Sequence, residues 1–126
     1  MPAPVSARLT LPRGMRMQQT REFTRVKEKG RRAVRGCLIM NWLPLLPTGA
    51  SKIGVITSRK IGKANIRTRA RRLLREVFRL HQHELSEPVA MVLVARNSIV
   101  RRKLADVEKD FLTLLRQANL IMNNKA

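Results

Sequence analysis

Hydrophobic residues recur along this chain with two different periods, and the change of period marks out its elements. Residues 33–43 have bulky side chains at every second position, which predicts a short strand followed by a longer one. Another strand is predicted over residues 52–57, and Val89–Ala95 is an almost continuous apolar run, typical of a strand buried on both faces. The larger side chains of the first run, which should face the core, are Leu38, Met40 and Trp42. The alternate positions, which should face the other way, are Cys37, Ile39 and Asn41.

Three further stretches have the spacing of amphipathic helices. The first covers residues 21–29, with Thr20 as its cap and Gly30 as its stop. The second begins at about residue 65, and the third covers residues 101–120. The apolar stripe of the second helix comprises Ile66, Ala70, Leu73, Leu74, Val77 and Leu80. That of the third comprises Leu104, Val107, Phe111, Leu114, Leu115 and Ala118.

The order helix, strands, helix, strand, helix predicts an α+β sandwich with the helices packed on one sheet. A length of 126 residues suits one domain with a core of modest size. We expect this domain to cover residues 18–120. Residues 1–17 contain prolines and arginines without a sustained period, which predicts a basic flexible tail. Residues 121–126 are interpreted as a polar C-terminal tail.

One side of the second helix is strongly basic. Arginines recur at every fourth position, opposite the apolar stripe, at Arg67, Arg71, Arg75 and Arg79. Arg69 and Arg72 flank this ridge. Like charges at this spacing destabilise a helix by about 0.2–0.5 kcal/mol per pair, and a bound phosphate backbone would remove that cost. Arginine suits phosphate because its planar fork donates two parallel hydrogen bonds to the oxygens.

The overall charge favours the same kind of partner. The formal net charge is +19 and the sequence pI is about 12.0, which makes nucleic acid the leading candidate over an anionic membrane surface. The longest apolar run, residues 37–46, is far shorter than the roughly 20 residues needed to span a bilayer. No secretory signal pattern opens the chain, and Cys37 has no partner for an internal disulfide. We therefore expect a cytoplasmic protein that binds no membrane.

The sequence predicts no self-sufficient active site. Nucleases that act alone usually gather several carboxylates around metal ions, whereas the acidic residues here are scattered. Asp106 and Asp110 share a helix face, but acids early in a helix are expected to complement its dipole. His81 and His83 lie two positions apart on a helix and point to different sides, so we interpret them as solvated or core-edge residues rather than metal ligands. Cys37 has no neighbouring base and should be a small buried hydrophobe.

The chain resembles a known family in the stretch that follows the third predicted strand. The residues SRKIGKA over 58–64 and IRTRARRLLREVF over 66–78 are similar to the signature of the bacterial ribonuclease P protein subunit. The likeness extends from about Arg16 to Ala118. In that family the RNA subunit is the catalyst and cleaves the 5′ leader from precursor tRNA with Mg²⁺. The protein subunit binds the RNA and holds the leader in a cleft between its sheet and its first helix.

The resemblance adds expectations about fold and partners. It implies a four-stranded sheet with a left-handed βαβ crossover, although base rates alone favour a right-handed one. The implied partners are the catalytic RNA and precursor tRNA, with no obligate protein partner. We expect no cofactor or metal on the protein itself, and Mg²⁺ held by the RNA.

Roles pass to this chain position by position where it matches the family pattern. The positions implied to bind RNA are Arg59, Lys60, Lys63, Arg67, Thr68, Arg69, Arg71, Arg72 and Arg75. The positions implied to line the 5′-leader cleft are Phe23, Lys27, Ile39 and Asn41. Three of these depart from the pattern, because the family usually has asparagine at Thr68 and aromatic residues at Lys27 and Asn41. With aromatic residues at 3% of the chain, we expect leader binding to depend more on charge than on base stacking. For Phe23, base stacking and core packing against Val26 remain equal alternatives.

Two other function classes stay open from the residues alone. A ribosomal or RNA-chaperone protein could use the same basic helix without any link to cleavage. A self-contained metal nuclease is disfavoured by the scattered carboxylates. The observation that separates these classes is whether cleavage appears only when a specific large RNA is added.

Overall fold

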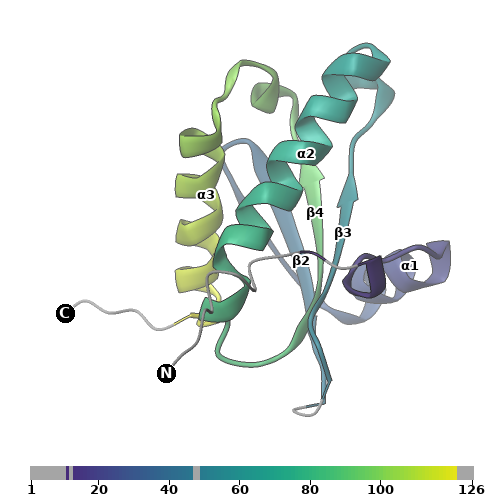
Figure 1. Ribbon diagram of the computed structural model, residues 1–126, viewed down its shortest axis with the longest axis vertical. Coiled ribbons are helices and arrows are strands. Elements are labelled where there is room, and N and C mark those ends of the chain that lie inside the picture. The colour runs from purple at the N-terminus through teal and green to yellow at the C-terminus, as the bar shows by residue number, and fades with distance from the viewer. Residues whose placement is uncertain (1–10, 12, 47–48, 122–126) are drawn as a thin grey trace.

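Four strands form one mixed sheet in the computed structural model, which describes residues 11, 13–46 and 49–121 (Figure 1). The strands lie in the order β1-β2-β4-β3 across the sheet. Their bounds are Arg31–Arg35 for β1, Leu38–Pro44 for β2, Lys52–Ile56 for β3 and Val89–Ala95 for β4. The helices are α1 at Thr20–Lys29, α2 at Ala64–His81 and α3 at Leu104–Gln117. The α+β class and the element order predicted from the sequence are confirmed.

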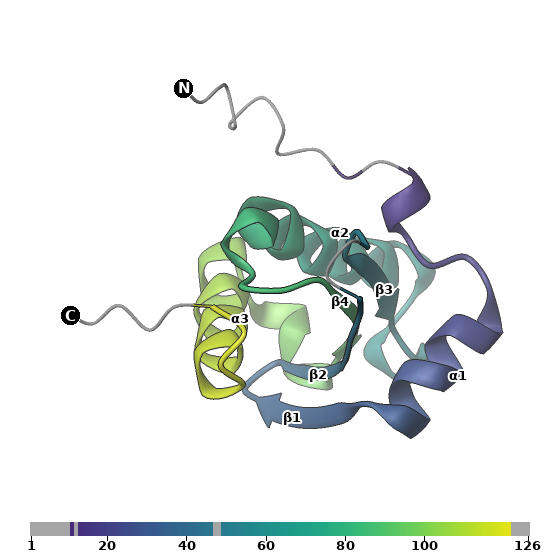
Figure 2. The same ribbon diagram turned by 90° about the horizontal axis from the view of Figure 1, so that it is seen from below.

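The connection from β3 to β4 sets the handedness of the fold. Strand β2 pairs antiparallel with both β1 and β4, whereas β3 pairs parallel with β4. In Figure 1 both parallel strands point upward, α2 lies in front of the sheet, and β4 lies to the left of β3. Figure 2, seen from below, shows the same arrangement. The βαβ crossover is therefore left-handed, as the resemblance implies and against the general preference.

The helices divide between the two faces of the sheet (Figure 2). Helices α2 and α3 cover one face, where Leu38, Met40, Leu74 and Phe111 belong to a large buried core. Helix α1 covers part of the other face, over a smaller cluster. That cluster consists of Met17, Val26, Ala90 and Val92. Because both faces are covered, β4 is buried along almost its whole length, as its continuous apolar run predicts.

Cys37 does not follow the predicted alternation. It joins Leu38 in the core under α2 and α3 instead of facing the opposite side. The reason is the tight turn between β1 and β2, where Gly36 has φ +55°, and where the Cys37 N–H donates to Asp110 Oδ2 at 3.0 Å. A side chain on Gly36 would collide with the Asp110 carboxylate. Asp110 therefore fastens this turn to α3.

The first residues of α1 and α3 are fixed by carboxylates that lie three positions after each helix cap. Glu22 Oε1 accepts the N–H groups of Gln18 and Gln19 at 3.1 and 3.2 Å, so Gln19 is the cap and the predicted cap, Thr20, is the first helical residue. These bonds, with a further bond from Lys52, lower the pKa of Glu22. Asp106 Oδ2 likewise accepts the Lys103 N–H at 3.0 Å. This contact starts α3 later than the predicted residue 101.

Both predicted tails extend too far into the folded domain. Residues 1–10, 12 and 122–126 of those tails lie outside the described residues. The segment Arg13–Met15 forms a 3₁₀ turn, and Met17 is buried against the sheet. At the other end Ile121 is also buried and forms a β-bridge with Leu85. Single apolar side chains make these contacts, so no periodic pattern in the sequence predicts them.

Candidate nucleic-acid interface

A basic turn leads from β3 into α2. The turn is a short 3₁₀ helix, Arg59–Ile61, and the buried side chain of Ile61 anchors it to the core. Arg59, Lys60 and Lys63 are exposed around this anchor. They stand at the N-terminal end of α2, where the free N–H groups of the helix add positive potential. The start of α2 therefore carries both side-chain and backbone positive charge.

Two arginines of α2 are held by neutral acceptors. Arg71 donates from Nη1 to Thr57 Oγ1 at 2.9 Å and from Nη2 to Thr68 Oγ1 at 3.3 Å. Arg69 Nη2 donates to the carbonyl oxygen of Arg102 at 2.7 Å. Hydroxyl and carbonyl oxygens orient a guanidinium group without neutralising it. These contacts therefore fix the arginines and leave their charge available to an anion.

The remaining arginines of this region complete a basic surface. Arg72 is exposed, while Arg67 and Arg75 are partly buried. Partial burial lowers the pKa of Arg75, and the nearby charges of Arg16 and Arg71 lower it further. We call this set the arginine surface; its members are Arg67, Arg69, Arg71, Arg72 and Arg75.

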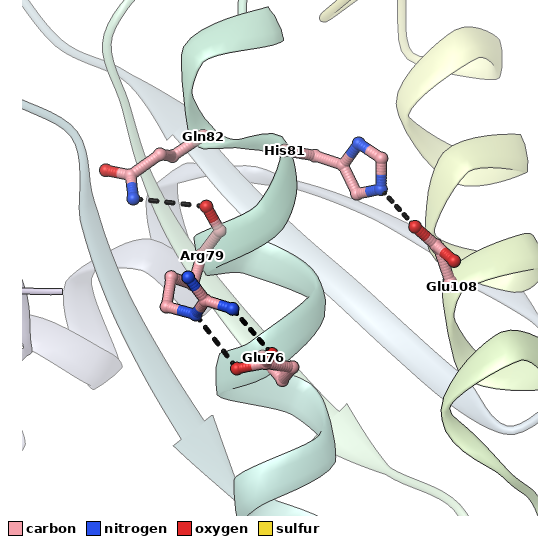
Figure 3. Close-up of polar contacts among 5 residues, drawn as sticks. All are labelled: Glu76, Arg79, His81, Gln82 and Glu108. Carbon is pink, nitrogen blue, oxygen red and sulfur yellow. Dashed lines mark hydrogen bonds and ion pairs between the residues drawn. The ribbon is translucent and has the colours of Figure 1, made fainter. Parts of the chain in front are cut away.

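Arg79 does not belong to this surface, although the sequence places it on the same ridge. Its Nε and Nη2 donate to the two carboxylate oxygens of Glu76 at 2.9 and 2.6 Å (Figure 3). The hydrogen bond from Arg79 lowers the pKa of Glu76, and the same pairing raises the pKa of Arg79. The predicted ridge therefore ends at Arg75, because its last cation is paired within the helix.

A cleft opens between α1 and the outer strand β3. It has a volume of about 440 Å³ and is lined by Thr20, Phe23, Thr24, Lys27, Val55, Ile56, Thr57 and Arg71. Phe23 reaches this cleft across Gly54, where an added Cβ would lie 2.5 Å from the Phe23 ring. Phe23 also packs against the cluster under α1, so the structure gives it both a core contact and a place in the cleft. Arg71 enters the cleft from α2 and joins it to the arginine surface.

Two predicted cleft residues, Ile39 and Asn41, do not line this cleft. Asn41 is only 4% exposed, because α1 packs across β2, so it does not line the cleft. Ile39 is half-buried and is also absent from the cleft lining. It stands in register with Val94, which is itself in register with Ile56 of the cleft. Ile39 therefore continues the apolar floor of the cleft across the sheet.

Two contacts of this site have no signal in the sequence. Thr57, which orients Arg71, is the residue after β3, and Arg102, whose carbonyl holds Arg69, lies before α3. Both contacts form only when α2 packs beside the sheet and α3. An alternating or helical pattern does not encode them.

The acidic residues are used mainly in structural contacts. Acidic side chains that bond to other protein groups are Glu22, Glu76, Glu84, Asp106, Glu108 and Asp110. Within the described residues, no group of three or more His, Cys, Asp or Glu side chains could hold a metal ion. His81 lies between Glu84 and Glu108, with nitrogen–oxygen distances of 2.6 Å to each. Burial, reinforced by Asp110, raises the pKa of the Cys37 thiol to about 12, which leaves it unreactive at neutral pH.

Comparison with known proteins identifies the family. The sequence pattern of the ribonuclease P family matches residues 11–119. The ribonuclease P protein component of Desulfovibrio desulfuricans is 39% identical over 113 residues, which cover 87% of each chain. That of Syntrophomonas wolfei is 33% identical, over 90% of this chain and 95% of its own length. The chain belongs to the ribonuclease P protein family.

Solved structures of ribonuclease P proteins have the same fold. The Staphylococcus aureus protein superposes with a TM-score of 0.77 at 18% identity, over 86% of this chain and 98% of that one. The Thermotoga maritima protein gives a TM-score of 0.71 at 23% identity, over 81% and 96%. The sequence relatives, which are ribonuclease P protein components, assign the chain to a ribonucleoprotein endoribonuclease of tRNA processing and do not favour a general RNA-binding role. Among the described residues, no helix is both long and apolar enough to cross a bilayer.

Proposed function

We propose that the chain is the accessory subunit of ribonuclease P, in which the RNA subunit cleaves precursor tRNA and this protein binds both RNAs. The observation that supports the proposal is the position of Arg71. This residue belongs to the arginine surface and also lines the cleft, so it connects the two. A single RNA-binding face thus includes an electrostatic patch for structured RNA and a groove for a single strand. The same proposal places the protein in the cytoplasm and assigns Mg²⁺ to the catalytic RNA.

The arginine surface contacts the phosphate backbone of the catalytic RNA. Its guanidinium groups are oriented by neutral acceptors, so the entropy lost on binding a phosphate is smaller than for mobile side chains. Arg59, Lys60 and Lys63 extend the contact around the start of α2. Phosphate contacts of this kind fix position and orientation and carry no sequence information. The protein therefore recognises RNA shape here.

The cleft holds the single-stranded 5′ leader. Lys27 and Arg71 supply cations at the cleft, and Val55 and Ile56 supply apolar surface for the bases. Within the described part of the chain, Phe23 is the only aromatic residue that lines the cleft. Because stacking is limited to that ring, leader affinity should be strongly salt-dependent. For ~5 phosphate contacts we expect log Kd to vary with log salt with a slope magnitude of about 3.5.

The proposal is tested by cleavage of precursor tRNA at low Mg²⁺ with the protein alone, the cognate catalytic RNA alone, and both together. We expect cleavage at the mature 5′ end to be strong only in the third mixture. Equal rates with and without the protein would remove the accessory role. Cleavage by the protein alone would show that it contains an active site.

A pair of lysine variants tests the leader cleft separately. Lys27 lines the cleft, whereas Lys29 is exposed on the same helix outside it. Lys27→Gln should weaken the binding of precursor tRNA and leave the binding of leaderless tRNA unchanged. Lys29→Gln removes the same charge and should affect neither. Equal effects of the two variants on precursor tRNA would contradict a specific leader contact at the cleft.

A further inference from the structure

The segment before α1 is attached to the outer edge of β3. The Met17 N–H donates to the Ile53 carbonyl oxygen at 2.8 Å, and Arg16 forms a parallel β-bridge with Ile53. The Met17 side chain is buried, 8% exposed, in the cluster under α1. Figure 2 shows the purple turn that precedes this attachment at the β3 edge of the molecule, beside α2. The turn Arg13–Met15 is therefore held in a fixed place relative to α2.

This attachment brings arginines from distant parts of the sequence to one cavity. The cavity has a volume of about 390 Å³ and is lined by Arg13, Arg16, Met17, Gln18 and Arg75. Arg13 and Arg16 come from the N-terminal segment, and Arg75 comes from the arginine surface of α2. Among the residues that the structure describes, no acidic side chain lines the cavity.

The three guanidinium groups are not neutralised within the described part of the chain, where the ion pairs involve other residues. Glu22 is the acid closest in sequence to Arg16, and it accepts bonds from Gln18, Gln19 and Lys52. Burial and the charges of Arg16 and Arg71 lower the pKa of Arg75. Such a convergence of like charges is unfavourable in the free protein and becomes favourable when an anion binds between them.

We propose that Arg13, Arg16 and Arg75 form a binding site for a phosphate group of an RNA backbone. The site adds a contact outside the basic helix motif and gives the attached N-terminal segment a role in RNA binding. It rests on the proposed function, since the RNA that supplies the phosphate is a substrate or partner of ribonuclease P. The guanidinium forks would donate paired hydrogen bonds to the phosphate oxygens.

The first test compares two double variants with the same loss of charge. Arg13→Ala/Arg16→Ala removes two cations from the site, whereas Arg35→Ala/Arg116→Ala removes two exposed cations from β1 and α3. We expect the first variant to bind the cognate catalytic RNA or a single-stranded leader oligonucleotide about 10-fold more weakly than the control variant. Its slope of log Kd against log salt should also be shallower, by about 0.7–0.9 for one lost phosphate contact. Affinities and slopes equal to those of the control variant for both RNAs would overturn the proposal.

The two RNAs distinguish the sources of the phosphate. Weaker binding of the catalytic RNA alone would assign the phosphate to that RNA, and weaker binding of the oligonucleotide alone would assign it to the leader. A double-mutant cycle adds a test of the shared site: after Arg75→Ala, the further loss of Arg13 and Arg16 should have a smaller effect than in the wild type. Purely additive effects would contradict a single site.

A second measurement does not depend on the variants folding normally. Inorganic phosphate is titrated into the wild-type protein, and the side-chain Nε–H signals of the arginines are followed by NMR. The Arg75 and Arg16 signals should shift together at phosphate concentrations that leave the signal of Arg116, an exposed residue of α3, unchanged. Identical titration of all three signals would overturn the site. In the variant Arg16→Ala, the Arg75 shift should weaken.

The site and the proposed function fail in different ways. If the protein stimulates precursor-tRNA cleavage but the two double variants bind RNA equally, the accessory role stands and the phosphate site is wrong. If the protein gives no stimulation but phosphate still shifts Arg16 and Arg75, the site stands and the accessory role is wrong.

Discussion

Between Ala64 and Arg75, α2 carries arginines that bond to neutral oxygens, whereas Arg79, one turn further on, bonds to a carboxylate. The last part of the helix continues this pairing. His81 contacts Glu84 on the following turn. It also contacts Glu108 on α3, and Gln82 bonds to the Arg79 carbonyl (Figure 3). We call this second region the paired end; its members are Glu76, Arg79, His81, Glu84 and Glu108.

The comparison indicates that the hydrogen-bond partner of an arginine in α2 determines how much of its charge is available to an anion. A hydroxyl or carbonyl acceptor positions Arg69 and Arg71 while their full charge remains available for phosphate. A carboxylate partner gives Arg79 a local ion pair, so we expect its attraction for RNA to be weaker. We therefore propose that the unpaired charge of α2 binds RNA, whereas the His81–Glu108 contact joins α2 to α3.

The largest expected effect comes from removing unpaired arginines. Arg71→Ala/Arg75→Ala should weaken binding of the catalytic RNA by about 10- to 100-fold, because hydrogen bonds to charged groups contribute about 1.5–3 kcal/mol each before salt screening. Arg79→Ala should change the affinity by less than about threefold, because that charge is already paired. Filter binding or fluorescence anisotropy at one fixed salt concentration measures both. Equal losses would show that the paired end also contacts RNA.

The next effect is on stability and comes from the paired end. His81→Gln should lower the free energy of unfolding by about 1–2 kcal/mol near pH 6, through loss of charged hydrogen bonds that are partly exposed to water. Urea unfolding measures this change, and Lys109→Gln, an exposed substitution on α3, is the control. RNA affinity at temperatures where both proteins are folded should be unchanged. A large loss of affinity would contradict the separation of the two regions.

The pH dependence of that stabilisation has a definite sign. Burial alone lowers the pKa of His81, but the bonds to Glu108 and Glu84 outweigh it and raise the pKa above the ordinary value of 6.5. The folded protein therefore holds this proton more tightly than the unfolded chain. The contribution is fully present below pH 6.5 and is lost as pH rises through the folded-state pKa.

Urea unfolding of the wild type and His81→Gln from pH 6 to pH 9 checks this dependence. The difference in stability should be largest at pH 6 and should narrow with rising pH. A constant difference across the range would show that the imidazolium charge does not contribute.

The smallest effect should come from Thr68, where the family pattern has asparagine. The hydroxyl of Thr68 accepts a long bond, 3.3 Å, from Arg71, and the shorter bond of Arg71 goes to Thr57. Thr68→Asn should therefore change affinity for the catalytic RNA by less than about threefold, whereas Thr57→Val should have the larger effect because it removes the main acceptor. A gain of tenfold or more with Thr68→Asn would show that the amide makes an RNA contact that the hydroxyl does not.

Periodic elements were predictable because their own residues encode them. The run Val89–Ala95 matches β4 at both ends. The predicted stripe is the buried side of α2 from Ile66 to Val77, but its last member, Leu80, is only partly buried, and Phe78 belongs to the core instead. The resemblance in residues 58–78 correctly indicated the family and the left-handed crossover. These features depend on contiguous sequence, so they are visible before the chain is folded.

Features that depend on contacts between distant segments were not predictable in this way. The burial of Asn41 under α1, the turn of Cys37 toward Asp110, and the attachment of Arg16 to β3 each join separate elements. The Arg79–Glu76 pair is different, because its spacing of three residues is visible in the sequence. The regular spacing of the arginines predicts that Arg79 continues the ridge, whereas its pairing with Glu76 ends the ridge at Arg75.

The most direct test of the account is precursor-tRNA cleavage at low Mg²⁺ by the catalytic RNA with each of three proteins: wild type, Arg71→Ala/Arg75→Ala, and Arg79→Ala. We predict strong stimulation by the wild type and by Arg79→Ala, and little stimulation by the double variant at protein concentrations that saturate the wild type. Equal stimulation by all three proteins, or equal loss in both variants, would contradict the claim that unpaired arginines of α2 bind the RNA while the paired end holds the fold.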